Sequence, residues 1–304
     1  MYEIRSFIKH PSIAHNAIKL TVLFFFTLGF NSACADELTT TKVTDSIHIV
    51  NGKGGNIGVF VGADGTYMID DKFAGMGEDI VSAVKALGGD HPRYLFNTHF
   101  HGDHTGSNEH FGSAGSVIVA HHNVRIRLEK GSSIATFNMV TPPAASQALP
   151  DITFDSDAAF HINGERVRVY HIPNAHTDGD AIVHFEGSNV IHAGDTFFNG
   201  FYPFIDVSNG GSVQGVIDAA NSMLALSNDQ TLIIPGHGPL AKPDDLMAYR
   251  DMLVSANAVL KSLKTEGKSA EQAAAEYPLL NLEEQWGVGM FSSEKWISIV
   301  YDSI

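Results

Sequence analysis

The stretch NTHFHGDHTG, residues 97–106, places four potential metal ligands close together, directly after an apolar run that we expect to form a buried strand at 93–96. His99 and His101 are two residues apart, so their side chains project to the same side of an extended backbone. Gly102 allows a sharp turn that can bring Asp103 and His104 to a second point in space. Imidazole and carboxylate are the ligands that zinc takes where no thiolate is present. Because a zinc site needs about four ligands, or three and a water, further ligands are expected elsewhere in the chain.

Three further candidate ligands follow three other expected strands. His176 comes shortly after a strand that we expect at 167–172, Asp195 follows one at 190–192, and His237 follows one at 231–234. Seven candidate ligands exceed the four or so that one zinc ion takes, which predicts two metal ions per chain. Zinc is the expected metal, and iron or manganese are the alternatives.

This pattern resembles the metallo-β-lactamase superfamily over roughly residues 40–265. The resemblance implies an α+β fold, an αββα sandwich of two mixed β-sheets with outer helices and with the metals at one edge. It also implies the ligands: His99, His101 and His176 for the first zinc, Asp103, His104 and His237 for the second, and Asp195 bridging both. Asp70 stands where the family has an aspartate that orients a ligand, and the adjacent Asp71 competes for that role.

The resemblance further implies a hydrolase, in which a hydroxide held by two zinc ions attacks a carbonyl and Asp103 orients that nucleophile. Asn209 is a candidate donor to the carbonyl oxygen, and the alternative is a plain turn before a helix at 213–226. Asp195 replaces the cysteine of the β-lactamases with the most similar spacing and agrees with glyoxalase II and the lactonases. Ser208–Ser212 shows no nucleophile elbow, so no serine nucleophile is expected.

The substrate stays open between several classes. A small cyclic amide or ester, such as a β-lactam or a lactone, is the first. A glyoxalase II-like thioester is the second, although no basic cluster for a glutathione carboxylate follows Thr265. Outside hydrolysis, the alternatives are a metal-binding protein or a mononuclear iron dioxygenase.

The first 35 residues are predicted to be a signal peptide. Basic residues precede an apolar run at 20–30, and Ala33-Cys34-Ala35 supplies small residues for cleavage. A short membrane anchor and a lipoprotein at Cys34 are the alternatives. We therefore expect one metallo-β-lactamase-fold domain at 36–304 in the periplasm or outside the cell. Cleavage would also remove the only cysteine, which excludes thiolate ligands from the mature protein.

The charge of the chain excludes two kinds of partner. The formal net charge is −15, and removing three basic residues and one acidic residue with the leader leaves −17. Such an acidic protein is a poor partner for nucleic acid or an anionic membrane. A small-molecule substrate is expected instead, without stable membrane association after cleavage.

Other segments carry weaker signals. Gly52–Asn56 is expected to form a hairpin tip beside the metals, and a final helix is expected after a capping box at Ser269 and Gln272, ending at Pro278. Gly131–Pro150 is expected to be an irregular lid or a packed surface loop, and it should shape the pocket together with Phe197–Ile205. The remaining histidines are expected to be structural, with His121 and His122 exposed at a helix start and His192 either behind a ligand or in the core. The histidines without any partner at ligand spacing are His48, His91, His110, His161, His171 and His184.

Overall fold

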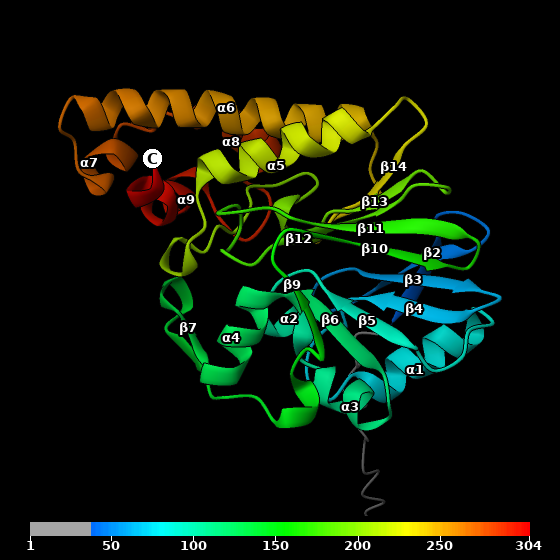
Figure 1. Cartoon of the computed structure of the whole chain (residues 1–304). Coiled ribbons are helices and arrows are strands. Elements are labelled where there is room, and N and C mark those ends of the chain that lie inside the picture. Colours follow the sequence, from blue (N-terminus) through cyan, green and yellow to red (C-terminus); the bar gives the residue numbers. More distant parts are fainter. Residues whose placement is uncertain (1–37) are drawn as a thin grey trace, which may run out of the picture. The chain divides into compact units, whose positions relative to one another are not determined.

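Two stacked β-sheets with helices on their outer faces make up the part of the chain that the computed structural model describes, residues 38–304 (Figure 1). This is the αββα sandwich of two mixed sheets that the sequence predicts. The predicted signal peptide lies outside the described residues. No helix within 38–304 combines the length and the apolar character that crossing a bilayer requires.

The first sheet has the strand order β1-β2-β3-β4-β5-β6-β9. Pairing is antiparallel from β1 to β4 and parallel from β4 through β5 and β6 to β9. A tight turn joins β3 to β4, with Gly62 paired to Gly65. The strands are β1 (Thr39–Lys42), β2 (Ile47–Asn51), β3 (Ile57–Gly62), β4 (Gly65–Ile69), β5 (Tyr94–Asn97), β6 (Val117–His121) and β9 (Ile152–Phe154).

The second sheet has the order β10-β11-β12-β13-β14, antiparallel except for the β13–β14 pair. Both sheets are therefore mixed. The strands are β10 (Asp157–Ile162), β11 (Glu165–His171), β12 (Ala181–Phe185), β13 (Val190–His192) and β14 (Leu232–Ile234).

One of the apolar cores fills the space between the two sheets. Alternate residues of β11, Val167 and Val169, point into it because successive side chains of a strand face opposite sides. Phe60 of the first sheet meets Phe185 of the second edge to face, with ring centroids 5.2 Å apart. This apolar layer holds the sheets at a fixed spacing, so their loop ends form a stable edge.

Helices cover both outer faces, as Figure 1 shows: α1 and α3 lie against the first sheet, and α5 and α6 lie over the second. Pro243 begins α6, and Ser269 with Gln272 forms the expected capping box of α7. Two helices then follow Pro278 where none was expected, anchored by the buried Trp286 and Trp296. The helices are α1 (Gly77–Ala86), α2 (Gly102–Thr105), α3 (Asn108–Ser113), α4 (His122–Lys130), α5 (Val213–Leu226), α6 (Pro243–Thr265), α7 (Ala270–Ala275), α8 (Leu280–Trp286) and α9 (Ser293–Val300).

The segment Gly131–Pro150 is more regular than its sequence indicates. It contains a separate two-stranded hairpin of β7 (Ser132–Ile134) and β8 (Met139–Thr141), in which Ile134 pairs with Met139. Each strand has only three residues and pairs only with the other, so neither produces a readable alternation of apolar and polar positions. The expectation of an irregular segment is wrong for this part.

Candidate metal centre

Strand ends at one edge of both sheets supply all seven candidate ligands. His99 follows β5, His101 caps the N-terminus of the short helix α2, and Asp103 and His104 lie within that helix. His176 comes from the loop between β11 and β12, Asp195 from a 3₁₀ turn after β13, and His237 from the loop after β14. The first sheet thus contributes four ligands and the second contributes three.

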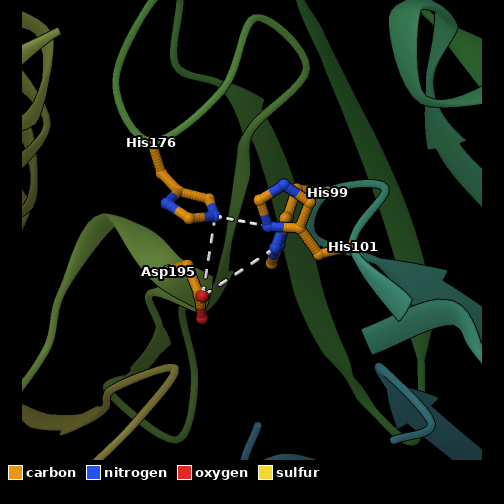
Figure 2. Close-up of side chains that lie close together, drawn as sticks. All are labelled: His99, His101, His176 and Asp195. Atoms are coloured by element: carbon orange, nitrogen blue, oxygen red, sulfur yellow. Dashed lines mark hydrogen bonds and ion pairs between the residues drawn. The ribbon is translucent and has the colours of Figure 1, made fainter. Parts of the chain in front are cut away.

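One group of four side chains is almost completely buried and is drawn in Figure 2. His176 Nε2 lies 2.9 Å from His101 Nδ1, and Asp195 Oδ2 lies 3.6 Å from His176 Nε2 and 3.8 Å from His99 Nε2. One donor atom from each of His99, His101, His176 and Asp195 lies within 4.8 Å of the others. These atoms face a common point, as ligands of one ion do.

Asp103, His104 and His237 form a second group with the same spacing limit of 4.8 Å. Asp103 Oδ2 lies 3.3 Å from His237 Nε2 and 3.5 Å from His104 Nε2. Asp195 faces this group as well, since its Oδ1 lies 3.0 Å from His104 Nε2 and its Oδ2 lies 3.4 Å from His237 Nε2. The Asp195 carboxylate therefore lies between the two groups.

Hydrogen bonds behind the rings fix which nitrogen faces inward. His176 Nδ1 lies 2.8 Å from the carbonyl oxygen of Phe204, to which it can donate, so its Nε2 faces the centre without a proton. His104 Nδ1 lies 2.7 Å from Asp70 Oδ2, and this contact turns the Nε2 of His104 toward the centre. His99 Nε2 is buried and has no hydrogen-bond partner within the described chain. A buried imidazole nitrogen without a partner is costly, and a metal ion would satisfy it, so this donor set fits two zinc ions.

Burial and charge act against each other at the centre. Burial lowers the pKa of His99 well below its ordinary value and that of His176 to about 4, so both rings are neutral at pH 7 and able to bind a metal. Burial opposes the ionisation of Asp195, but the neighbouring His104 and His237 outweigh it and hold the pKa of Asp195 well below the usual range. The centre thus offers two neutral imidazoles, His99 and His176, and an ionised carboxylate. Although burial opposes it, Asp195 raises the pKa of His104 well above its ordinary value and that of His237 to about 9, so these two rings would release a proton on binding a metal.

Asp70 lies directly behind the ligands. Its Oδ1 accepts the Thr98 amide at 2.7 Å, and its Oδ2 accepts the Thr98 hydroxyl at 2.7 Å in addition to its contact with His104. Asp71 points elsewhere and accepts the amide of Ser107 at 3.0 Å, so it does not compete for this role. Asp70 alone therefore orients the ring of His104.

Two residues that support the site escape the sequence analysis. Asp206 Oδ2 lies 3.0 Å from His101 Nε2, and the buried Lys72 donates from Nζ to the Gly55 carbonyl at 2.6 Å. Lys72 thereby holds the hairpin tip at 52–56, whose Gly55 lies against His104 as expected for a tip beside the metals. A lone carboxylate or lysine in an irregular segment leaves no periodic signal in the sequence.

The side chain of Asn209 does not line the cavity beside the centre, contrary to the expectation of a carbonyl donor. Its Nδ2 donates to Asp206 Oδ2 at 2.6 Å and to the Ser133 carbonyl at 2.8 Å, and its Oδ1 accepts from Arg127. The side chain is buried, and both donor hydrogens are used. Asn209 therefore holds Asp206 in place behind His101.

Two of the remaining histidines have defined structural roles. His192 is fully buried, with Nε2 3.2 Å from the Asn56 carbonyl, so it packs in the core and supports the hairpin tip. His121 is also buried and stacks on His171 with ring centroids 3.6 Å apart, which corrects the expectation that it is exposed. Its neighbour His122 is exposed as expected.

The centre opens toward solvent on one side only. The side chains of Asp103 and His237 are 20% and 23% exposed, whereas that of Asp195 is 4% exposed. Both Asp103 and His237 line a cavity of about 720 Å³, to whose walls Gly131–Pro150 and Phe197–Ile205 contribute as expected. A substrate would therefore reach the centre past Asp103 and His237.

Comparison with known proteins places this geometry in a family. A family model described as the metallo-beta-lactamase superfamily matches residues 50–237, more than half of the chain. The chain belongs to the metallo-β-lactamase superfamily. The matched stretch contains every candidate ligand of this superfamily member, from His99 to His237. No curated protein sequence matches the chain significantly.

Solved structures show the same fold at low sequence identity. A metallo-β-lactamase from Pontibacter korlensis is 18% identical with a TM-score of 0.58, covering 71% of this chain and 99% of that one. The metallo-β-lactamase FIM-1 from Pseudomonas aeruginosa, in its mono-zinc form, is 15% identical with a TM-score of 0.56, covering 72% and 96%. A double mutant of the sec-alkyl sulfatase PisA1 is 15% identical with a TM-score of 0.59, covering 79% and 45%. At these identities the similarity shows the superfamily fold alone.

Proposed function

We propose that this superfamily member is a hydrolase that binds two zinc ions and cleaves a carbonyl substrate. The observation that carries the proposal is the position of Asp195, with one oxygen 3.0 Å from His104 Nε2 and the other 3.6 Å from His176 Nε2. A carboxylate in this position would help to hold both ions. When bound, a zinc pair supplies a hydroxide nucleophile at neutral pH and a Lewis acid for the carbonyl oxygen.

The residues of the chain divide the remaining tasks. His99, His101 and His176 would hold the first ion, and Asp103, His104 and His237 the second. Asp103 and His237 are the most exposed of the ligands that line the cavity, so they border the place where a substrate would react. The pKa of Asp103 is about 2, because His104 and His237 outweigh the effect of burial. Asp103 is therefore ionised at neutral pH and can accept a hydrogen bond from the nucleophile.

The thioester alternative finds no support at the cavity. A glutathione thioester carries carboxylates far from the reactive carbonyl, and recognising them requires cationic groups. Within residues 38–304, no lysine or arginine lines the cavity. We therefore favour a cyclic ester or amide, or a simple ester.

Zinc titration and a substrate panel test the proposal together. Chelator-treated protein is titrated with zinc, and hydrolysis of lactones, esters, β-lactams and thioesters is followed by acid release at constant pH. We expect about two zinc ions per chain and turnover that appears as they bind. His122→Ala, which removes an exposed histidine outside the centre, is the control and should change neither. Binding of two zinc ions without turnover of any carbonyl substrate would contradict the proposed function.

A further inference from the structure

The cavity beside the centre is walled almost entirely by apolar side chains. Phe100, Phe198 and Phe204 line it close to the ligands, and Ile134, Phe137 and Met139 of the β7–β8 hairpin also contribute to its wall. The Phe137 ring lies 4.8 Å from that of Phe204, which in turn lies 6.2 Å from the ring of Phe291. At about 720 Å³, the cavity lies in the upper part of the range for small-molecule sites.

The charged groups of the cavity are of one sign apart from the histidines. Asp103, Asp195 and Glu109 line it, and within the described chain no lysine or arginine does. Two nearby cations are already engaged: Lys72 donates to Gly55, and Arg127 pairs with Asp178 at 2.7 Å. Lys53 lies outside the lining, on the exposed hairpin tip, with Nζ 5.7 Å from the centroid of the Phe73 ring.

A substrate with a carboxylate remote from its reactive carbonyl would lose water on entering this cavity and gain no partner. Burying an unpaired charge is strongly unfavourable, whereas each buried methylene favours binding. The mouth is also apolar, since Met139 is 43% and Met290 67% exposed. Flexible methionine side chains adapt to an alkyl chain of variable position.

We propose that the substrate is a neutral ester or lactone that carries an alkyl chain, and that this chain occupies the apolar cavity beside the metal centre, which Phe100, Phe198 and the β7–β8 hairpin line. The proposal rests on the proposed hydrolase function and names its substrate class. The anionic β-lactams are poor substrates on this view, because the cavity provides no cation for their carboxylate.

A series of γ-alkyl lactones tests this with the zinc-loaded protein. We expect kcat/KM to rise about threefold for each added methylene until the cavity is full. A matched lactone that ends in a carboxylate, and the β-lactam nitrocefin, should react at least tenfold more slowly than the neutral lactone of equal length. A flat chain-length series, or a preference for the carboxylate compounds, overturns the proposal.

Two variants that add the same charge test where the alkyl chain of the substrate binds. Met139 and Val140 are adjacent on β8, so their side chains point to opposite faces, and only Met139 lines the cavity. For a γ-lactone with a decyl chain, Met139→Lys should lower kcat/KM about tenfold. For the lactone that ends in a carboxylate, the same variant should raise kcat/KM. Val140→Lys adds the same charge at a residue that is 77% exposed and should change either value less than twofold. Equal effects of the two variants would contradict the assignment of the cavity.

A binding measurement separates the two proposals. Alkyl methyl ketones, which are not hydrolysed, should displace the neutral dye Nile red from the protein, more tightly with each methylene and more weakly with a terminal carboxylate. If no lactone or ester is turned over but this binding order holds, the hydrolase proposal fails and the alkyl site stands. If turnover is found but the affinity for ketones does not depend on their chain length, the proposal of an alkyl site fails and the hydrolase proposal stands.

Discussion

Asp206 Oδ2 lies 3.0 Å from Nε2 of His101, and this contact leaves Nδ1 of the same ring facing His176. Asp206 is itself held by the Ser208 hydroxyl and the Asn209 amide, both at 2.6 Å. The orientation of one candidate ligand thus depends on a network of side chains from a neighbouring loop.

Removing this support should weaken metal binding without removing a ligand. We expect Asp206→Ala to lower zinc affinity about 10- to 100-fold, the effect usual for groups that orient a metal-binding histidine. Competition with a chelator measures this affinity. The zinc affinity of Asp206→Asn should lie between that of Asp206→Ala and that of the wild type. Gln230→Ala, an exposed substitution remote from the centre, should leave the zinc affinity unchanged. Unchanged zinc affinity in Asp206→Ala would show that His101 is oriented without this contact.

The Asp195 carboxylate should be needed for a full complement of metal. Because it faces both ligand groups, Asp195→Ala should reduce bound zinc from about two ions to one or fewer and abolish turnover. Asp195→Cys would give one ion a soft ligand and release the other from the bridge, so we expect lower activity on the native substrate. Metal analysis and kinetics are measured on the same samples. An Asp195→Ala protein with two ions and full activity would remove Asp195 from the centre.

Close approach of backbone to the ligands should make one glycine irreplaceable. A Cβ at Gly236 would lie 2.1 Å from Asp195 Oδ1, whereas a Cβ at Gly102 meets nothing within 4 Å. Gly236→Ala should therefore displace Asp195, lower zinc content and reduce the rise in Tm that zinc produces. Gly102→Ala, within the ligand segment itself, is the matched control and should behave as wild type. Comparable losses in both variants would point to general damage instead.

Acid should destabilise the fold partly through His121. Its Nδ1 accepts the Asn123 amide at 3.3 Å and its Nε2 lies 3.2 Å from the Asp155 carbonyl, which suits the neutral ring. Burial, with His171 stacked alongside, lowers its pKa to about 4. Between about pH 6.5 and 4 the unfolded chain therefore binds the proton and the folded chain does not, so stability falls as pH falls through this window.

Urea unfolding at several pH values, with chelator present, measures the contribution of His121. His121→Asn keeps an acceptor for the Asn123 amide and removes the titration, so its stability should fall less between pH 6.5 and 4.5 than that of the wild type. His122→Asn is the control at the exposed neighbour. Identical pH profiles for the His121 variant and the wild type would argue against this contribution.

Export is predicted to remove residues 1–35. N-terminal sequencing of the exported protein should begin at Asp36, because Ala33-Cys34-Ala35 provides the small residues that cleavage requires. Retention of Met1, or acylation at Cys34, would contradict this prediction.

The ligand set could be predicted from the sequence because its signals are local. NTHFHGDHTG places four ligands within six residues, and Asp195 and His237 each follow a glycine at a strand end. The residue pattern and the order of the strands were therefore enough to predict the ligands. The two mixed sheets were expected from the family resemblance, and the strand expected at 167–172 ends one residue later than β11 does.

The supporting contacts could not be predicted in this way. Asp206 reaches His101 across 105 positions of sequence, and Asn209 serves Asp206 instead of a substrate. Neither contact has a period or a spacing to detect. The burial of His121 depends on His171 from the other sheet, a pairing that only the stacked sheets create.

The division of the candidate ligands, four from one sheet and three from the other, gives the centre a mechanical consequence. Ions bound by residues of both sheets would link the two halves of the chain. No disulfide can serve this purpose, because the only cysteine of the protein lies in the predicted leader. Metal uptake would then contribute to the free energy of folding, and scarcity of zinc would shorten the lifetime of the protein by exposing it to proteases, in addition to stopping turnover.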